Sequence, residues 1–137
     1  MAWPIVVVEP ALSWLHELRR ADRSTAQQVG AALRVLSEEG PALGRPLVDS
    51  LKCKSLDHLK ELRPGSTGSS EVRLLFVFDP DRNAVILVGG DKAGRWRSWY
   101  SCAIKRAEQA YAEYLAERLA ARKSLEAKTG TQSTRTG

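Results

Sequence analysis

The stretch EVRLLFVF at residues 71–78 decides the fold, because it is the strongest strand pattern in the chain. Its branched and aromatic residues favour an extended backbone. Side chains alternate across a sheet, so this strand has two distinct faces. One face is wholly apolar and consists of Val72, Leu74, Phe76 and Phe78. Arg73 points to the opposite face, in the middle of the sheet and away from the helices expected on the apolar face.

Two further strands flank this segment. The turn-forming composition of residues 79–83 leads into a second apolar run, Ala84 to Val88. On the other side, the Gly- and Ser-rich residues 64–70 separate it from a weaker strand pattern over Leu56 to Arg63. Three consecutive strands joined by turns predict an antiparallel meander.

The first forty residues predict a strand followed by a helical hairpin. Ile5 to Val8 is a β-branched run typical of a buried strand. Leucines near helical spacing predict a first helix over Ala11 to Arg20. Ser24 with Gln27 forms a capping-box pattern that starts a second helix.

The remaining segments complete one α+β domain. Residues 41–55 show no hydrophobic periodicity and predict an irregular connection. Near the other end of the chain, Ser98 is placed to cap a long helix that ends near Arg122. The order β-α-α-β-β-β-α predicts a small antiparallel sheet with an N-terminal helical hairpin packed on one face and a C-terminal helix. We expect all helices to pack on the same face of this sheet. We expect a single domain over residues 1–122 and a disordered tail over residues 123–137.

Composition excludes several classes of protein. With 137 residues, 43% hydrophobic and 27% charged, the chain falls in the globular range. No apolar run approaches the roughly 18 residues of a membrane span, and no signal-peptide pattern precedes Ile5, so we expect a cytoplasmic protein without a membrane partner. Two cysteines outside any C-x-x-C pair and two histidines predict neither a disulfide framework nor a metal site. The glycine-rich residues 89–94 match no nucleotide-binding motif, and we expect no cofactor.

Positive charge is concentrated in the middle of the chain. The net charge is +5, and residues 51–107 hold 11 basic and 6 acidic residues. A localised basic region indicates an anionic partner, most often nucleic acid. Trp96 and Trp99 lie among these cations, where an exposed tryptophan stacks on unpaired bases. Burial against the sheet is the favoured interpretation for Trp99, whereas Trp96 is open to either.

Few side chains in this region titrate near neutral pH. Arg73 is a candidate phosphate anchor, and the alternative is a structural ion pair with Glu61 or Glu71. His58 is the only histidine placed to act as an acid or base. Tyr100 belongs to the apolar stripe of the last helix, although its hydroxyl can emerge at a cleft. This inventory suits RNA cleavage by the substrate's own 2′-hydroxyl, for which a protein orients the RNA and stabilises charge without a metal.

Four short motifs occur in an order that resembles one known family. They are the L-x-E-L-R segment at residues 59–63, the strand VRLLF at 72–76, the strand and basic loop ILVGGDK at 86–92, and IKRA at 104–107. Together they resemble the RelE/ParE superfamily of toxins from type II toxin–antitoxin systems, and within it the HigB-like, phage-derived branch. The resemblance covers about residues 3 to 122.

The resemblance implies a ribosome-dependent mRNA endonuclease that inhibits translation. Its implied partners are the ribosome, mRNA and a cognate antitoxin of the helix-turn-helix type. The implied catalytic residues are Arg73, Lys92, Arg95 and Tyr100. The residues expected to bind RNA are Lys52, Lys54, Lys60, Arg63, Trp96 and Arg97. Two alternatives stay open: a ParE-type toxin that inhibits DNA gyrase without nuclease activity, and a non-enzymatic nucleic-acid-binding protein on the same fold.

Overall fold

The computed structural model describes residues 2–136 of the chain, with side chains as far as residue 129. Within these residues one mixed sheet has the strand order β1-β5-β4-β3-β2. The strands are β1 (Ile5–Val7), β2 (Val48–Ser50), β3 (Lys60–Leu62), β4 (Val72–Phe78) and β5 (Ala84–Asp91). The expected antiparallel meander is confirmed as β3-β4-β5, while β1 pairs with β5 in parallel.

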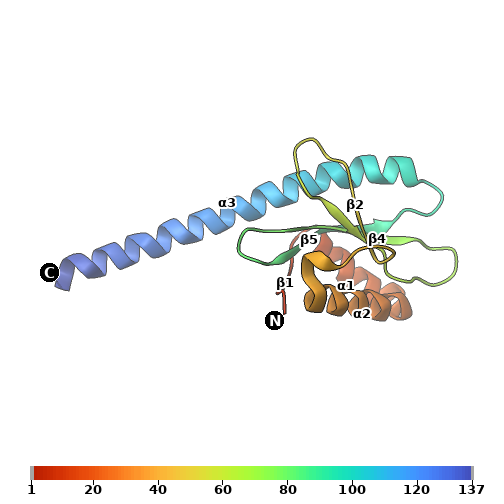
Figure 1. Ribbon diagram of the computed structural model, residues 1–137, viewed down its shortest axis with the longest axis horizontal. Helices are drawn as coiled ribbons and strands as arrows, with labels where there is room; N and C mark the ends of the chain where they lie inside the picture. Colours follow the sequence, from red (N-terminus) through yellow and green to blue (C-terminus); the bar gives the residue numbers. More distant parts are fainter. Residues whose placement is uncertain (1, 137) are drawn as a thin grey trace.

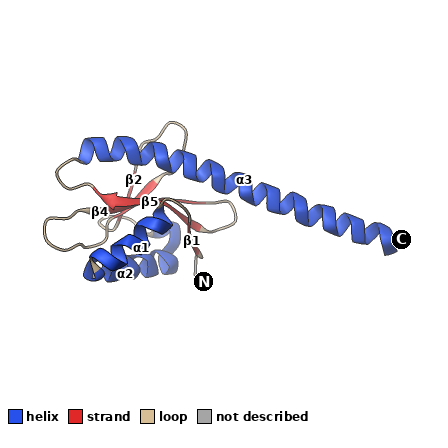
Figure 2. Ribbon diagram, turned by 180° about the vertical axis from the view of Figure 1, so that it is seen from behind, coloured by secondary structure: helices blue, strands red, loops and turns tan. Residues whose placement is uncertain are grey.

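Helices cover both faces of the sheet (Figure 1). They are α1 (Ala11–Ala21), α2 (Arg23–Glu39), the short 3-10 helix η1 (Gly40–Ala42) and α3 (Trp96–Thr136). The α1–α2 hairpin lies on one face and α3 crosses the other, as the reverse view also shows (Figure 2). The α+β fold is therefore confirmed, but the expectation that all helices pack on one face is wrong.

The reason lies in the strands, which are apolar on both faces. On β4, Leu74 packs in a core with α1 and α2, while its neighbour Leu75 packs in a second core under α3. Leu87 of β5 joins the second core, and the small residues Ala103 and Ala107 of α3 let the helix approach the sheet closely. A strand that buries both faces needs a helical layer on each side.

The second helix begins earlier than its capping-box pattern predicted. Asp22 is the N-cap, and its side chain accepts a hydrogen bond from the backbone N–H of Thr25 at 3.1 Å. Asp22 also accepts hydrogen bonds from the hydroxyls of Thr25 and Thr67. Ser24 lies within the helix instead of capping it. An aspartate two residues before a serine competes for the same cap, and here its contact with Thr67 adds a tertiary anchor.

The segment before the meander contains a strand that the sequence did not reveal. Val48–Ser50 forms β2, which pairs antiparallel with β3 at the sheet edge, where we had expected only irregular chain. Conversely, β3 is shorter than the predicted Leu56 to Arg63. His58 lies in an exposed turn with a φ of 65°, not in a strand. Strands of three residues are too short to show an alternating pattern.

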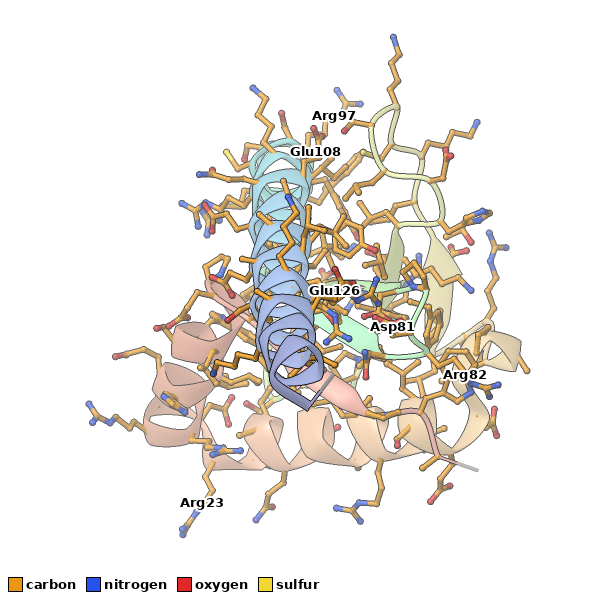
Figure 3. The ribbon with its side chains drawn as sticks, turned by 90° about the vertical axis from the view of Figure 1, so that its left-hand side faces the viewer. Arg23, Asp81, Arg82, Arg97, Glu108 and Glu126 are labelled. Atoms are coloured by element: carbon orange, nitrogen blue, oxygen red, sulfur yellow. The ribbon has the colours of Figure 1, made fainter. Side chains whose placement is uncertain are left out.

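Helix α3 extends well past the sheet (Figure 1). Its course is anchored by the β4–β5 turn: the Tyr114 hydroxyl donates to buried Asp79, and Arg118 and Arg122 pair with Asp81. Figure 3 looks along α3 and shows Asp81 beside the helix. The helix continues beyond Arg122, where we expected it to end, to Thr136. Although α3 has 41 residues, neither it nor any other described helix is apolar enough to cross a membrane.

Candidate functional site

A cluster of charged and phenolic side chains lies on the α3 face of the sheet. Its members are Glu61, Arg63, Arg73, Lys92 and Tyr100. They come from β3 and the residue after it, β4, the residue after β5, and the first turns of α3. These residues are far apart in the sequence, and they meet because the meander brings three strands together and α3 folds back over them.

Strand register places the two arginines side by side. Leu62 of β3 pairs with Leu74 of β4. One residue further along, Arg63 faces Arg73 on the side of the sheet that α3 covers. Two guanidinium groups in this position generate a local positive potential, and one acidic side chain, Glu61, pairs with Arg63.

Glu61 is the buried centre of the cluster, with 1% of its surface exposed. The Tyr100 hydroxyl donates to its Oε2 at 2.5 Å, and the Nε of Arg63 donates to its Oε1 at 2.8 Å. A buried carboxylate is stable only when it is paired and hydrogen-bonded, and here both oxygens have partners. Glu61 therefore fixes the position of Tyr100 and Arg63.

Arg63 also links the cluster to the edge strand. Its Nη2 lies 3.1 Å from Oδ2 of Asp49 in β2, and Asp49 further pairs with Arg45. The hydrogen bond to Glu61 raises the pKa of Arg63, and the hydrogen bond from Arg45 lowers the pKa of Asp49. Both groups are therefore charged over the whole working pH range, and the guanidinium of Arg63 is held by two carboxylates.

Tyr100 is kept as a neutral phenol. Burial, followed by the hydrogen bond to Glu61, raises its pKa to about 12, while the charges of Arg73 and Arg63 act in the opposite direction. The phenol therefore carries its proton at neutral pH and acts as a hydrogen-bond donor. Tyr100 also packs edge-on against Trp99, with ring centroids 5.0 Å apart.

Arg73 has a different environment from Arg63. Its Nη1 donates to the carbonyl oxygen of Val72 at 2.7 Å, while its buried Nε has no hydrogen-bond partner. Among the ion pairs of the described residues none involves Arg73, because Glu61 pairs with Arg63 and Glu71 pairs with Lys92. The guanidinium of Arg73 therefore retains donors and an uncompensated charge with which to bind an anion.

Lys92 closes the cluster from the loop after β5. Its Nζ lies 3.4 Å from Glu71 and 5.6 Å from the centroid of the Tyr100 ring. The loop itself is braced by Asp91, whose Oδ1 accepts the backbone N–H groups of Glu71 and Ala93. The ammonium of Lys92 is thus held near the phenol of Tyr100 by both the loop backbone and an ion pair.

Of the ten residues singled out in the sequence, four come together in this cluster: Arg63, Arg73, Lys92 and Tyr100. The others lie around it or elsewhere. Lys52 and Lys54 are exposed on the segment between β2 and β3. Lys60 points to the opposite face of the sheet, where its Nζ lies 5.5 Å from the Phe78 ring centroid.

The remaining three residues, Arg95, Trp96 and Arg97, lie at the start of α3 and are exposed. The Trp96 side chain has 56% of its surface exposed, with the Arg97 guanidinium 5.2 Å from the ring centroid. Figure 3 shows Arg97 pointing outward. Trp99, in contrast, is buried as favoured, because it packs against Gly90 of β5.

Sequence reasoning gave Glu61 only the role of an ion-pair partner for Arg73. The alternation of side chains along β3 could have indicated that Glu61 lies beside Arg63, because the two residues are two positions apart and share one face of the strand. The contact with Tyr100, 39 residues away, is not visible in any local pattern. Asp49 was missed together with its strand β2.

The cluster as a whole suits a phosphodiester. It offers one unpaired guanidinium, a lysine ammonium and a neutral phenol within a small part of one surface, with exposed cations and an exposed indole nearby. Guanidinium and ammonium groups bind phosphate oxygens, and exposed aromatic rings stack on unpaired bases.

Residues 16–112 match the model of a family described as "Phage derived protein Gp49-like (DUF891)". Two proteins of Mycobacterium tuberculosis (strain ATCC 25618 / H37Rv) are similar to the chain. "Putative toxin HigB2" is 54% identical over 110 residues, which make up 80% of this chain and 53% of that protein. "Putative toxin HigB3" is 39% identical over 112 residues, 82% of this chain and 93% of that protein.

The chain thus spans about half the length of the first relative and nearly all of the second. No solved structure matches the chain significantly. The family model covers the second half of α1, the whole of α2, the strands from β2 onward and the first turns of α3, so it includes every residue of the cluster. The HigB-like resemblance found in the sequence is confirmed, and the chain belongs to the Gp49-like family of phage-derived proteins.

Proposed function

We propose that this chain is the toxin of a toxin–antitoxin system and that it cleaves mRNA on the ribosome. The names of its two relatives support the toxin assignment. The observation that carries the nuclease assignment is Arg73, a half-buried arginine with an unpartnered Nε and no ion pair among the described residues. An uncompensated guanidinium close enough to a fixed phenol to act on its pKa is suited to stabilise the charge that develops on a phosphoryl group.

In the proposed reaction the RNA supplies its own nucleophile. The 2′-hydroxyl attacks the adjacent phosphorus and its proton passes to solvent, the bond from phosphorus to the 5′ oxygen breaks, and a 2′,3′-cyclic phosphate remains. Arg73 stabilises the extra negative charge that develops on the phosphoryl oxygens. Arg63, already held by Glu61 and Asp49, contributes positive potential rather than a direct contact.

The leaving 5′ oxygen needs a proton. The one hydroxyl proton of Tyr100 is engaged in the hydrogen bond to Glu61, whereas the ammonium of Lys92 has three N–H bonds and, among the described residues, one ion-pair partner, Glu71. Lys92 is therefore the proposed proton donor, and the Tyr100 ring, fixed by Glu61, positions the Lys92 ammonium by packing. Arg95, Arg97 and Trp96 are proposed to hold the flanking nucleotides, and Lys52 and Lys54 the ribosomal RNA or mRNA backbone.

The test is a translation assay in which mRNA ends are mapped with and without ribosomes. Cuts that occur only in translating complexes, that carry cyclic phosphate ends and that vanish in Arg73→Ala are the expected result. Intact mRNA together with gyrase-linked DNA breaks would refute the nuclease and favour the ParE-type alternative. Intact mRNA and intact DNA would favour the non-enzymatic alternative.

A further inference from the structure

The outer edge of β5 carries backbone groups that no neighbouring strand uses. β1 pairs with β5 only as far as Ile86, and no strand of the described chain continues this row. The backbone N–H of Lys92 donates to the carbonyl of Glu71, so residue 92 faces β4. Because neighbouring residues of a strand alternate, the N–H and C=O groups of Gly89 and Asp91 point away from β4, into the open edge.

A cleft of about 500 Å³ lies against this edge, between Trp14 of α1 and Trp99 of α3. A Cβ at Gly89 would lie 2.2 Å from Cε3 of Trp14, and a Cβ at Gly90 would lie 2.4 Å from Nε1 of Trp99. The two glycines therefore let one indole pack on each face of β5, beside the cleft. A cleft of this size falls within the range of small-molecule sites.

The position of the cleft favours a flat ligand. Hydrogen bonds from a strand edge run sideways within the sheet, so a ligand that makes them extends the sheet in its own plane. Helices cover the two faces of the sheet, and a ring coplanar with β5 is therefore bounded on both sides (Figure 2). Trp14 supplies an apolar wall on the α1 side, and Trp99 with Ala103 supplies one on the α3 side. An aromatic heterocycle with polar groups on one edge meets these conditions.

The order of the backbone groups favours particular nucleobases. Along the edge, the N–H and C=O of Gly89 are followed by the N–H and C=O of Asp91, so donors and acceptors alternate. The hydrogen-bonding edge of adenine has an amino donor beside a ring-nitrogen acceptor, and the edge of uracil alternates as well. Guanine and cytosine each have two like groups side by side, one of which would face a like group of the strand. Adenine, with two rings, covers more of the apolar walls than uracil does.

Three charged residues line the cleft: Arg95, Arg106 and Asp91. Asp91 is already engaged, because its Oδ1 accepts the backbone N–H groups of Glu71 and Ala93. Its carboxylate still lowers the positive potential, so the cleft has only a small excess of positive charge. The place of a phosphate group therefore depends on the acidic neighbours of each arginine.

The two arginines differ in these neighbours. Arg106 also lines an adjoining cleft of about 270 Å³, where Glu9 and Glu113 are the other charged residues. Two carboxylates outweigh one guanidinium, which makes that end unfavourable for a phosphate. Arg95 has one carboxylate in the same cleft, Asp91, and takes part in no ion pair among the described residues. A phosphate group is therefore favoured at Arg95 only.

This asymmetry favours a free nucleotide over a unit of RNA. A nucleotide within RNA has a phosphate on each side, and the second phosphate would have to leave the cleft past Glu9 and Glu113. A mononucleotide has its phosphate at one end only. No residue of the cluster around Arg73 lines this cleft, so it is separate from the proposed nuclease site.

We propose that the cleft binds a free adenine mononucleotide, with the base hydrogen-bonded to the open edge of β5 between Trp14 and Trp99 and the phosphate on Arg95. Backbone groups carry the recognition of the base. This is why the glycine-rich residues 89–94 match no nucleotide-binding motif although they contribute to the site.

The first experiment titrates AMP into the full chain and follows hydrogen exchange of the backbone amides by NMR. We expect slower exchange at Gly89 and Asp91. N6,N6-dimethyl-AMP keeps the rings and the phosphate but lacks the amino N–H, and it should bind about tenfold more weakly. Absence of protection at both amides, or equal binding of the methylated nucleotide, would overturn the proposal.

The choice of base is tested with GMP, CMP and UMP. All three carry the same phosphate as AMP, so their attraction to Arg95 is the same. We expect each to bind about tenfold more weakly than AMP, because a hydrogen bond or apolar contact with the walls is lost. Binding of any of them as tight as that of AMP would overturn adenine as the base.

The phosphate position is tested by single substitutions. Arg95→Gln should weaken AMP by about tenfold or more, because a charge-assisted hydrogen bond is lost, and should leave binding of the uncharged adenosine unchanged. Arg97→Gln is the matched control, since Arg97 is exposed, points outward in Figure 3 and does not line the cleft. Equal weakening by both changes, or a larger loss in Arg106→Gln, would overturn this position.

A steric test uses the exposed thiol that lines the cleft. In a Cys53→Ser background, alkylation of Cys102 with N-ethylmaleimide should block AMP while the NMR spectrum shows an intact fold. Unchanged binding of AMP to the alkylated chain would contradict the proposed location.

The last comparison separates a free nucleotide from RNA. The trinucleotide UpApU with 2′-O-methyl riboses cannot be cleaved by 2′-hydroxyl attack, so it reports binding alone. It should protect Gly89 and Asp91 more weakly than AMP does, and protection as strong as that by AMP would assign the cleft to RNA and overturn the proposal. None of these measurements depends on RNA cleavage, so a chain that binds AMP but leaves mRNA intact would refute the endonuclease and not the cleft.

Discussion

The hydroxyl of Tyr100 donates a hydrogen bond of 2.5 Å to the buried carboxylate of Glu61. This contact joins the first turns of α3 to β3 and sets the orientation of the phenol, whose pKa is raised by burial and partly lowered by the charges of Arg73 and Arg63. The same carboxylate receives Arg63 on its other oxygen. One acidic side chain therefore decides which arginine of the pair is neutralised and which stays free for an anion.

Glu61→Gln should destabilise the fold by about 1–3 kcal/mol, because two charge-assisted hydrogen bonds at a buried site become neutral ones. The same change should lower the pKa of Tyr100, since the hydrogen bond to Glu61 helps to raise it to about 12. Urea unfolding and an ultraviolet titration of the phenol measure the two effects. Glu71→Gln, at an exposed carboxylate, is the matched control and should cost less than about 0.5 kcal/mol. Equal costs at both sites would contradict the central role of Glu61.

Stability should fall steeply at alkaline pH. The folded-state pKa values of Tyr100 and Tyr114 are raised to about 12, above the roughly 10 of an unfolded tyrosine. Their stabilising contribution is complete below pH 10 and is lost as pH rises from about 10 to about 12, because the unfolded chain releases these protons first. Unfolding measured across this range should show the fall, and Tyr100→Phe combined with Tyr114→Phe should flatten it. An unchanged slope in the double variant would refute this linkage.

Arg73→Ala should remove activity and keep the fold. Arg73 has no ion pair among the described residues, so we expect a change in unfolding free energy of no more than about 1 kcal/mol. Cleavage should fall on the order of 100-fold or more, as for other electrostatic donors. Arg73→Lys should recover only part, because an ammonium lacks the bidentate fork. A folded Arg73→Ala protein with undiminished cleavage would refute the catalytic role of Arg73. A strongly lowered melting temperature of this variant would indicate a structural role instead.

Lys52→Ala combined with Lys54→Ala should reduce the salt dependence of ribosome or RNA binding. Loss of two phosphate contacts reduces the slope of log K against log salt by about 1.4–1.8. The control is Arg23→Ala with Arg34→Ala, two exposed cations on α2, of which Arg23 points away from the sheet in Figure 3. A slope that changes equally in both pairs would mean that only net charge matters.

Truncation tests the proposed domain boundary at residue 122. The described side chains beyond Arg122 are all exposed, so a chain that ends there should melt within about 2 °C of the full chain. A chain that ends after Glu113 loses Tyr114 and its contact with Asp79, and should lose about 3 kcal/mol or more. Similar melting temperatures for both truncations would show that α3 is not held by the β4–β5 turn.

The local patterns of the chain were sufficient for much of the fold. Period-two alternation in residues 72–78 placed the side chains of Arg73 and Leu74 on opposite faces of the strand. Helical spacing predicted the α1–α2 hairpin. These features depend on neighbours within a few residues, which is the range over which sequence patterns act. Strand β2 was not predicted, because three residues carry too little pattern. The Asp22 cap was not predicted, because Thr67, far along the chain, completes it.

By itself, the sequence determined the α+β class, the meander, the basic middle of the chain and the candidates Arg73, Lys92 and Tyr100. Only the tertiary structure decided that α3 covers the second face of the sheet and that Glu61 pairs with Arg63 and Tyr100, leaving Arg73 unpaired. The physical reason is that alternation and helical period describe how one segment presents its faces. Which carboxylate meets which cation depends on the packing of segments that are 39 residues apart.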